Sequence, residues 1–510
     1  MAIQAGGVTF SRHKTVIPPK TGGGSVTPNA SEDLSPWQPT PNDKWDLAKV
    51  RHLSRRAGFG LKPEEAEKLL QIGHKLSIDI YLIVPNRTIP ERGTFLLPSG
   101  EIINMSAFSH QVAAWVWLMT NSPYQLQEKM ALFWHDHFST GISKVRYPEL
   151  MGRTINLYRR HALGDFRQLL IECGIDPGML YFLDNRLSRA RKPNENWGRE
   201  LMELYSMGVG GGYTETDIKQ ASRCFTGWRN VLDYAFFDPS RVWHDPGVKQ
   251  VLGRTIDNRA LGATRRAVLK DGSDVVDAIL AHPSSAKFIV RKIWEYFVYE
   301  KPSQALVDKL AAIWRQDRYN IGALLETILR SKAFFSKQAM RSLVKSPVEF
   351  VVGMLRQTDT TNLRYIRAGA LIGQMGLPIM AYPGPDGVKE GQAWVNAQSM
   401  INRLNFAKEA IERRAIWNRT ALRSNLKPDR EIRRKSIPTG TPEPIVDAFL
   451  EIFVDGAVPK GVRDNLVRYM RMTDVGPYPW SYPGANNRTR DEKLAGLHHL
   501  IFALPEFHIS

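Results

Sequence analysis

Amphipathic helical periodicity recurs along most of this chain and constrains its fold more than any other feature. Residues 284–300 (SSAKFIVRKIWEYFVYE) and 320–335 (NIGALLETILRSKAFF) place apolar side chains three or four positions apart, the spacing of one face of an α-helix. Apolar residues make up 43% of the chain, which is a globular composition. We therefore predict a mainly α protein with a large multi-helix globular fold and one or two small β-hairpins.

Short interruptions divide this helical pattern. TFLL and EIIN predict a hairpin over Thr94–Asn104, and residues 228–256 predict a second hairpin or an irregular loop region. Residues 1–44 are rich in Gly, Pro, Ser and Thr, so we expect a flexible or surface-draped N-terminal arm, with Trp37 as its anchor. Residues 45–510 then form a single helical domain, with two lobes, 45–270 and 271–510, as an alternative division.

The net charge of +18 at pH 7 favours an anionic partner, although a solvated surface accounts for it equally well. We find no zinc finger, no aromatic RNA-binding signature and no basic heptad region, so no specific nucleic-acid motif accompanies the charge. Residues 401–440 are the strongest candidate contact for an anionic polymer, with 11 Lys and Arg against 4 Asp and Glu, a net charge of +7. The alternative for this segment is a solvated helix face followed by a loop.

The compartment is suggested by what the sequence lacks. Two cysteines are too few for a disulfide scaffold. No stretch approaches the roughly 20 apolar residues that span a bilayer. The first residues, MAIQAGGVTFSRHKTVIPPK, lack the apolar run of a secretory signal. These features predict a cytoplasmic location, with export by another route as the alternative.

The segment Phe133–Phe138 (FWHDHF) holds the densest group of metal-type ligands, since imidazole and carboxylate groups both bind divalent ions. On a regular helix, residues i and i+2 point about 200° apart, so one face does not present both histidines to one ion. We therefore expect one of two arrangements. Either the backbone leaves helical geometry and His135 and His137 bind one ion, or one of them faces a site while the other faces the core.

A second polar group runs from Asn194 to Tyr205, in a predicted helix over 196–207 that Gly208 ends. Glu195 and Arg199 are four residues apart, which also fits an ordinary helical ion pair. Glu200 and Glu203 lie beside apolar residues, where carboxylates are costly to bury unless they are paired or bound to an ion. We predict Glu200, Glu203 and Arg199 as catalytic candidates and Glu195 as a candidate metal ligand.

A third group is Trp243–Gly247 (WHDPG), in which His244 is a further candidate metal ligand and Asp245 a candidate base. Asp-Pro-Gly is also a plain turn signal. The chain has no phosphate-loop lysine motif, no Gly-x-Ser-x-Gly elbow and no His-Glu-x-x-His pair. A serine nucleophile or a nucleotide-binding loop therefore has no support.

The same segments carry a resemblance to a bacterial family called domain of unknown function 1800, which spans about residues 50–508. The matching motifs are His52–Gly60 (HLSRRAGFG), Leu132–Phe138, Asn194–Gly208, Gly212–Thr214, Phe225–Trp228, His244-Asp245 with Lys249, and Leu504–Phe507. Gly198 and Ser54 stand where that family usually has Ala and often Leu, and neither is a candidate ligand. The resemblance implies a large helical fold without an agreed activity, and a partnership with a sulfatase-like protein on anionic or sulfated material.

Two main hypotheses follow from these residues. The first is a metal-assisted hydrolase acting on an anionic substrate, in which a divalent ion activates a water molecule and a free glutamate acts as base. The second is a non-catalytic binding or scaffold protein for an anionic polymer or a partner protein. In that case the polar groups of the first half form a buried ionic network that fixes the fold. A haem protein is a third hypothesis, for which no attachment motif is present.

Overall fold

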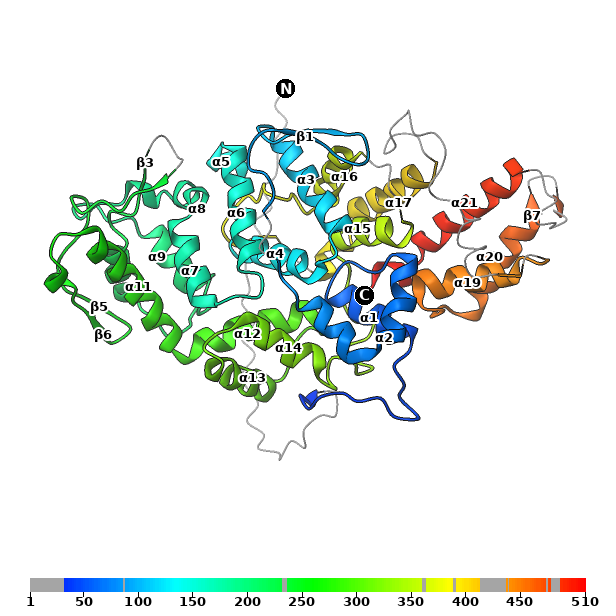
Figure 1. Ribbon diagram of the computed structural model, residues 1–510, viewed down its shortest axis with the longest axis horizontal. Helices are drawn as coiled ribbons and strands as arrows, with labels where there is room; N and C mark the ends of the chain where they lie inside the picture. Colours follow the sequence, from blue (N-terminus) through cyan, green and yellow to red (C-terminus); the bar gives the residue numbers. More distant parts are fainter. Residues whose placement is uncertain are drawn as a thin grey trace, which may run out of the picture.

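The fold is mainly α, as predicted, and the order of its elements follows the helical segments of the sequence (Figure 1). The structure, a computed structural model, describes residues 32–85, 88–231, 236–359, 364–388, 391–412, 437–438, 440–473, 476–477 and 487–510. Along the long axis in Figure 1, β5, β6 and α11 lie at one end, α4 and α12 near the middle, and α19–α21 at the other.

The helices of the first half surround the predicted polar groups. They are α1 (Leu47–Arg56), α2 (Pro63–Tyr81), α3 (Phe108–Asn121), α4 (Gln125–His137), α5 (Ile142–Val145), α6 (Pro148–Arg160), α7 (Phe166–Ile175), α8 (Pro177–Phe182), η2 (Asn185–Leu187), α9 (Asn196–Glu203), α10 (Glu215–Cys224) and η4 (Arg259–Leu261). The second half adds α11 (Arg265–Ala281), α12 (Pro283–Phe297), α13 (Gln304–Gln316), α14 (Ile321–Arg330), α15 (Pro347–Gln357), α16 (Tyr365–Gln374), η5 (Gly391–Trp394), α17 (Ala397–Glu412), α19 (Glu443–Val454), α20 (Lys460–Arg471), α21 (Asn487–Ala503) and η7 (Pro505–His508). Helices from both sides of residue 270 pack together, as α3 does against α16.

Four short antiparallel strand pairs complete the described part of the chain. The first predicted hairpin is confirmed as β1 (Thr94–Leu96) with β2 (Ile102–Asn104), which pair in the register Phe95 opposite Ile103. The predicted irregular region holds two pairs, β3 (Asn230–Val231) with β4 (Phe236–Phe237) and β5 (Lys249–Val251) with β6 (Arg254–Ile256). The sequence pattern did not predict the fourth pair, β7 (Met472–Thr473) with β8 (Gly476–Pro477).

Two positions in the helices, one in α2 and one at the end of α9, show where local sequence sets the backbone conformation and where long-range packing does. Gly73 interrupts α2 with φ = 81°, a left-handed conformation that favours glycine. The end predicted for α9 was wrong, because the helix stops at Glu203 rather than at Met207. Beyond that point the backbone N–H groups of Tyr205 and Met207 donate to carbonyls five residues earlier, which makes a wider turn than that of an α-helix.

Helix α1 carries the first family-like motif and ties the N-terminal end of the described chain to its C-terminal helices. Arg51 and Arg55 both bind the carboxylate of Asp455, which directly follows α19, and Arg341 binds the same group at 3.1 Å. Burial favours the neutral acid, yet the charge of Arg55 and its hydrogen bonds outweigh burial and lower the pKa of Asp455. The motif is therefore occupied in holding the fold.

The described part of the predicted N-terminal arm, residues 32–44, lies along the edge of α14. The backbone N–H of Trp37 donates to the Arg330 carbonyl at 2.7 Å, and its indole N–H donates to Asp43 at 2.6 Å. The indole is buried and packs on Phe335, with ring centroids 5.2 Å apart. Trp37 is thus the anchor of this segment.

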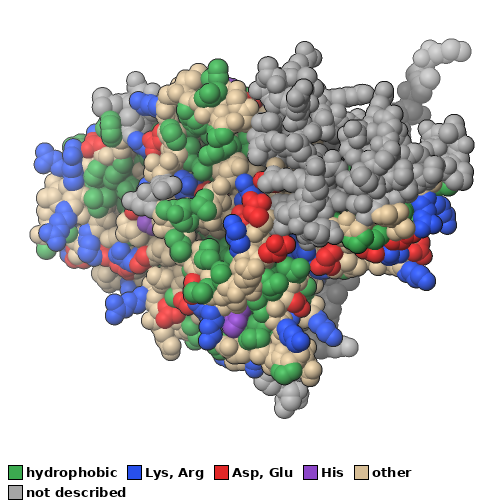
Figure 2. All heavy atoms as spheres, turned by 45° about the vertical axis from the view of Figure 1, so that its right-hand side comes forward, with side chains coloured by type: hydrophobic (Ala, Val, Ile, Leu, Met, Phe, Trp, Pro, Cys, Tyr) green, Lys and Arg blue, Asp and Glu red, His purple; other side chains and the backbone are tan. Residues whose placement is uncertain are grey.

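The described surface mixes charges, and on the face in Figure 2 Lys and Arg side chains lie among Asp and Glu. Within the described residues, no helix combines the length and apolar character needed to cross a membrane. Most of the basic segment 401–440 (residues 413–436 and 439) lies outside the described residues. Of its described members, Arg403 is buried and donates to the Lys345 carbonyl at 2.8 Å, so this arginine is unavailable to an anionic polymer.

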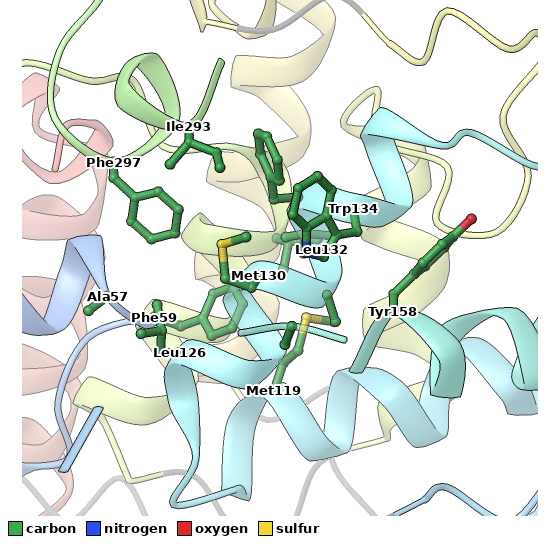
Figure 3. Packing of buried hydrophobic residues seen from close by; sticks show 14 of the residues in the cluster. Ala57, Phe59, Met119, Leu126, Met130, Leu132, Trp134, Tyr158, Ile293 and Phe297 are labelled. Atoms are coloured by element: carbon green, nitrogen blue, oxygen red, sulfur yellow. The ribbon is translucent and has the colours of Figure 1, made fainter. Parts of the chain in front are cut away.

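The core surrounds α4, which is buried along nearly its whole length although many of its residues are polar. Its apolar side chains, such as Met130 and Trp134, lie among Phe59, Ile293 and Phe297 (Figure 3). Its polar side chains reach other helices. Lys129 pairs with Glu349 on α15, while Glu128 accepts from the Arg159 guanidinium on α6 at 2.9–3.0 Å and from the Trp115 indole on α3 at 3.1 Å.

We expect Glu128→Ala to lower the free energy of unfolding by about 3–5 kcal/mol, because Arg159 is buried and would lose its carboxylate partner. The measurement is the midpoint of chemical denaturation. Asp447→Ala is the control. Asp447 binds the Arg463 guanidinium at 2.5 Å, but both side chains are partly exposed, so the expected loss is below about 1 kcal/mol. Equal losses in the two variants would contradict the importance of the buried pair.

Candidate functional site

The first predicted polar group lies at the C-terminal end of α4, and the helix continues through it without a break. His135 and His137 consequently face different neighbours, as one of the two predicted arrangements requires. His135 is fully buried. Its Nε2 atom accepts the backbone N–H of Met380 at 2.8 Å, and its ring stacks on Tyr382 with centroids 4.7 Å apart. Burial lowers the pKa of His135 to about 3, so the ring stays neutral and can accept.

His137 is also buried and binds two neighbours through its two ring nitrogens. Its Nε2–H donates to the Tyr205 carbonyl at 3.0 Å, and its Nδ1 atom accepts from the Lys292 ammonium on α12 at 3.0 Å. Burial, followed by the charge of Lys292, lowers the pKa of His137 well below its ordinary value. The imidazole is thus held in a single neutral tautomer.

These contacts bring the first two predicted groups together. Tyr205 follows α9 directly, so the His137 hydrogen bond fixes the end of the helix that carries Glu200 and Glu203. The rings of Phe138 and Tyr205 add a contact at 5.2 Å between centroids. Asp136, between the two histidines, accepts the Val388 backbone N–H at 3.3 Å. The three consecutive residues 135–137 therefore hold three separate backbone positions.

On α9, Arg199 forms the predicted ion pair with Glu195 and two further pairs. Its guanidinium lies 3.3 Å from Glu195, 3.3 Å from Glu203 and 2.7 Å from Glu215 at the start of α10. Since these groups are partly or largely exposed, the pairs contribute little to stability. The pairs nevertheless mean that Glu195, Glu203 and Arg199 bind one another, on the side of α9 that faces α10.

The third predicted group forms a separate network. His244 lies between two acceptors, the Thr226 carbonyl at 2.9 Å from Nδ1 and the Asp271 carboxylate at 3.1 Å from Nε2. Lys249 pairs with the same carboxylate, and Asp245 binds the Arg223 guanidinium at 2.7 Å. This network fixes the loop before β5 against α11, and it does not bring His244 or Asp245 to the other two groups.

The predicted metal ligands His135, His137, Glu195 and His244 do not gather around one point. The ring nitrogens of His137 and His244 face other partners, and Glu195 pairs with Arg199. Among the residues that the structure describes, no group of three or more His, Cys, Asp or Glu is arranged to hold an ion. The predicted set does not fit a single ion in this arrangement, and the divalent ion stays a prediction that elemental analysis of the purified protein tests.

A pocket of about 950 Å³ opens beside Glu200. Its walls come from α5 and the two residues after it, from residues 181–186, from α9 and from the loop 383–385. Three cations, Lys144, Arg146 and Arg186, line it together with the carboxylates of Asp184 and Glu200. Lys144 pairs with Asp184 at 2.9 Å. No ion pair in the described residues involves Arg146 or Arg186, so the pocket presents positive charge.

The two histidines of α4 position two walls of this pocket. His135 holds Met380, and the segment 380–382 leads directly into the wall loop 383–385. The same segment pairs with the start of α5, where Ile142 donates to the Met380 carbonyl at 3.0 Å. A side chain at Gly141 would collide with the Tyr382 carbonyl, so glycine permits this close approach. His137 holds the end of α9.

Glu200 is the one predicted catalytic residue that lines the pocket, and it is half-buried. Burial is the largest cause of a raised pKa at Glu200. The nearby carboxylates of Glu203 and Asp386 raise this pKa further, while the positive charge of Arg199 lowers it. Because its pKa is raised, Glu200 keeps its proton to a higher pH than an ordinary glutamate, which suits it to donate that proton.

Two non-glycine residues in the pocket wall adopt the left-handed conformation. Arg146 has φ = 68° at the end of α5, and Asp184 has φ = 56° before η2. Such residues are uncommon outside glycine and collect at functional sites when the surrounding structure fixes them. Arg186 is fixed further, because its guanidinium lies 4.4 Å from the centre of the Tyr181 ring.

Four features of the pocket were not predicted from the sequence: Lys144, Arg146, Arg186 and the loop 383–385. Isolated basic residues such as Lys144 and Arg146 resemble any solvated surface, so these two gave no signal of their own. The turn residues Pro383-Gly384-Pro385 mark a loop but not its distant partner. Arg186 begins a cluster of basic residues over 186–192, which is a signal that the sequence does carry.

A second pocket of about 300 Å³ lies on the other side of α4, between α4, α12 and the segment 343–349. His137, Lys292 and Glu349 are among its lining residues, together with the rings of Phe133 and Trp394. Since His137 binds Lys292 and Glu349 binds Lys129, the polar groups of this pocket are mostly occupied with one another.

Comparison with known proteins gives one match. A protein-family model described as "Protein of unknown function (DUF1800)" covers residues 52–509, nearly the whole chain. Neither the curated proteins nor the solved structures include a match.

We expect His135→Ala to lower the free energy of unfolding by about 2–4 kcal/mol at pH 7, because the Met380 N–H would be left buried without an acceptor. His110→Ala is the matched control. The Nδ1 atom of His110 also accepts a backbone N–H, that of Asn104 at 2.8 Å, but at the surface, so a loss below about 1 kcal/mol is expected. Chemical denaturation with elemental analysis of both proteins measures the effect.

The pH dependence supplies a second readout. An unfolded imidazole takes up a proton below its ordinary pKa, whereas folded His135, with a pKa of about 3, does not. The stabilisation is therefore present above about pH 6.5 and is lost as the pH falls below it. We expect the difference between the parent protein and His135→Ala to shrink on acidification. A variant of parental stability that had lost a bound metal would support the metal hypothesis instead.

Proposed function

The chain belongs to the family described as "Protein of unknown function (DUF1800)", and because that description assigns no activity, we propose a function from the Glu200 pocket: hydrolysis of an anionic substrate by acid–base chemistry. The observation that carries the proposal is the position of a half-buried carboxyl with a raised pKa in a pocket lined by three cations. The cations supply the anion contact, and Glu200 supplies the proton transfer.

The charges of the pocket support an anionic substrate. Arg146 and Arg186 are guanidinium groups without a carboxylate partner in the described residues, and guanidinium groups bind carboxylate, phosphate and sulfate oxygens with two hydrogen bonds. Lys144 adds a third positive charge next to Asp184. The amide of Asn196 and the hydroxyl of Ser143 offer neutral hydrogen bonds from the same walls. A substrate with both an anionic group and hydroxyl groups matches this set.

The raised pKa of Glu200 supports the role of general acid. In the proposed step, protonated Glu200 donates its proton to the leaving oxygen as the bond to that oxygen breaks and its electron pair moves onto the oxygen. Water then forms the new bond at the electrophilic centre and returns a proton to Glu200. The products are the two fragments plus the elements of one water molecule, and Glu200 ends in its starting form.

A binding protein without catalysis is the second candidate function. The observation that favours it is that Lys144, Arg146 and Arg186 account for an anion contact without any part played by Glu200. The two candidates differ in what Glu200→Gln does, since a binding protein has no step that needs this proton.

The test uses phenyl sulfate, phenyl phosphate and phenyl glucuronide as small anionic probes, because phenolate is a poor leaving group whose departure needs a proton from a general acid. We expect the parent protein to hydrolyse at least one of them. Glu200→Gln should lower the rate by about 100-fold or more, the usual contribution of a general acid. The rate of the parent should fall as the pH rises through the raised pKa of Glu200, because the acid form is then lost. Glu215→Gln, which removes an exposed carboxylate on α10, should retain the parental rate.

Stability separates a loss of function from a loss of fold. Since the pKa of Glu200 is raised in the folded protein, its ionisation as the pH rises costs stability. Glu200→Gln should therefore keep or raise the denaturation midpoint at pH 7. If none of the three probes is hydrolysed while they bind in a way that Arg146→Gln abolishes, the binding candidate replaces the hydrolase.

A further inference from the structure

A strip of basic side chains leads away from the Glu200 pocket. Arg186 stands in the pocket wall, and the chain continues through Arg189, Arg191 and Lys192 before the first acidic residue, Glu195. Within the described part of the chain, none of these four cations has a carboxylate within ion-pair distance, whereas many other Lys and Arg residues do. An unpaired run of this kind leaves a local excess of positive charge next to the pocket.

The strip is held in place before any ligand binds. The backbone groups of Arg189 and Lys192 exchange hydrogen bonds at 2.8 and 3.3 Å, which closes a tight turn. The N–H of Ala190 donates to the Trp243 carbonyl at 2.7 Å and fixes that turn to the loop before β5. The guanidinium of Arg189 lies on the Trp243 ring, 3.7 Å from its centre. Rigid placement lowers the entropic cost of binding an extended partner.

We propose that Arg189, Arg191 and Lys192 form a surface that binds an anionic polysaccharide and leads its chain into the Glu200 pocket. This inference rests on the proposed function and names its substrate class. A single small anion would be satisfied by Lys144, Arg146 and Arg186 alone, so the additional cations imply further charged units along one chain. The hydroxyl and amide groups of Ser143 and Asn196 suit the sugar units between those charges.

The aromatic rings argue against single-stranded nucleic acid as the polymer. Proteins that bind single strands stack bases on open aromatic faces. Here the guanidinium groups of Arg189 and Arg229 lie over the Trp243 ring at 3.7 and 5.0 Å, and Arg186 lies over Tyr181 at 4.4 Å. With those faces in contact with cations, the strip offers charge and hydrogen bonds rather than a stacking platform.

The test compares two triple variants of the full chain. Arg189→Gln/Arg191→Gln/Lys192→Gln removes three charges from the strip, and Lys75→Gln/Lys309→Gln/Lys337→Gln removes three exposed charges elsewhere. Binding of polygalacturonate and of heparin is measured over a range of salt concentrations, so that carboxylated and sulfated polymers are distinguished. We expect the strip variant to lose about tenfold in affinity for one of the polymers, as three exposed charge contacts imply, with a weaker salt dependence. The control triple should bind like the parent.

The outcomes separate this inference from the proposed function. If the strip variant binds both polymers like the parent while Arg146→Gln/Arg186→Gln loses the small anionic probes, the strip proposal is wrong and the pocket proposal stands. If small probes and polymers bind neither the parent nor the variants, both proposals fail. If an oligonucleotide of equal charge binds the parent more tightly than either polysaccharide, and the strip variant loses that binding, nucleic acid replaces the polysaccharide.

Discussion

The burial of α4 is the constraint on which the rest of the structure depends. This helix carries glutamate, lysine and two histidines into the core, and an unpaired buried charge or hydrogen-bonding group costs from about 1 to 5 kcal/mol. A domain is stable by only about 5–15 kcal/mol in total, so few of these groups can go without partners. Each partner lies on a different element: Glu128 reaches α6 and α3, Lys129 reaches α15, and His137 reaches α12. Pairing at α4 thereby specifies where five helices meet.

The same pairing connects the core to the pocket. His135 and Asp136 hold the backbone at Met380 and Val388, on either side of the loop 383–385, and His137 holds the end of α9. The walls of the pocket are thus set by His135, Asp136 and His137, each of which binds a backbone group of another segment. Glu200 differs from them, because burial and the neighbouring carboxylates both oppose its charge. A group in an unfavourable environment persists only where others fix the backbone around it, and here α4 provides that support.

The sequence predicted the helices and hairpins well, but it did not predict which distant residues the polar side chains contact. Local signals located the helices and the hairpin over Thr94–Asn104, since each depends on residues a few positions apart. Helical geometry also predicted that His135 and His137 would point apart. The partner of His135 is 245 residues away, and no periodicity encodes such a distance. For the same reason the sequence did not identify Arg146 as a pocket residue. The end of α9 was predicted four residues too late, because the Tyr205–His137 contact overrides the local glycine signal.

These contacts explain why a segment rich in metal-type ligands does not have to be a metal site. A neutral imidazole can be buried and still both donate and accept a hydrogen bond. In a helix that crosses the core, it can therefore link two groups of other elements while staying neutral itself, as His137 does between the Tyr205 carbonyl and the Lys292 ammonium. The FWHDHF segment suggested chemistry at its own side chains. That chemistry is better supported at the carboxyl group of Glu200, on the helix whose end His137 holds. The residues most recognisable in the sequence hold the site, and less recognisable ones, Arg146 and Arg186, give it its charge.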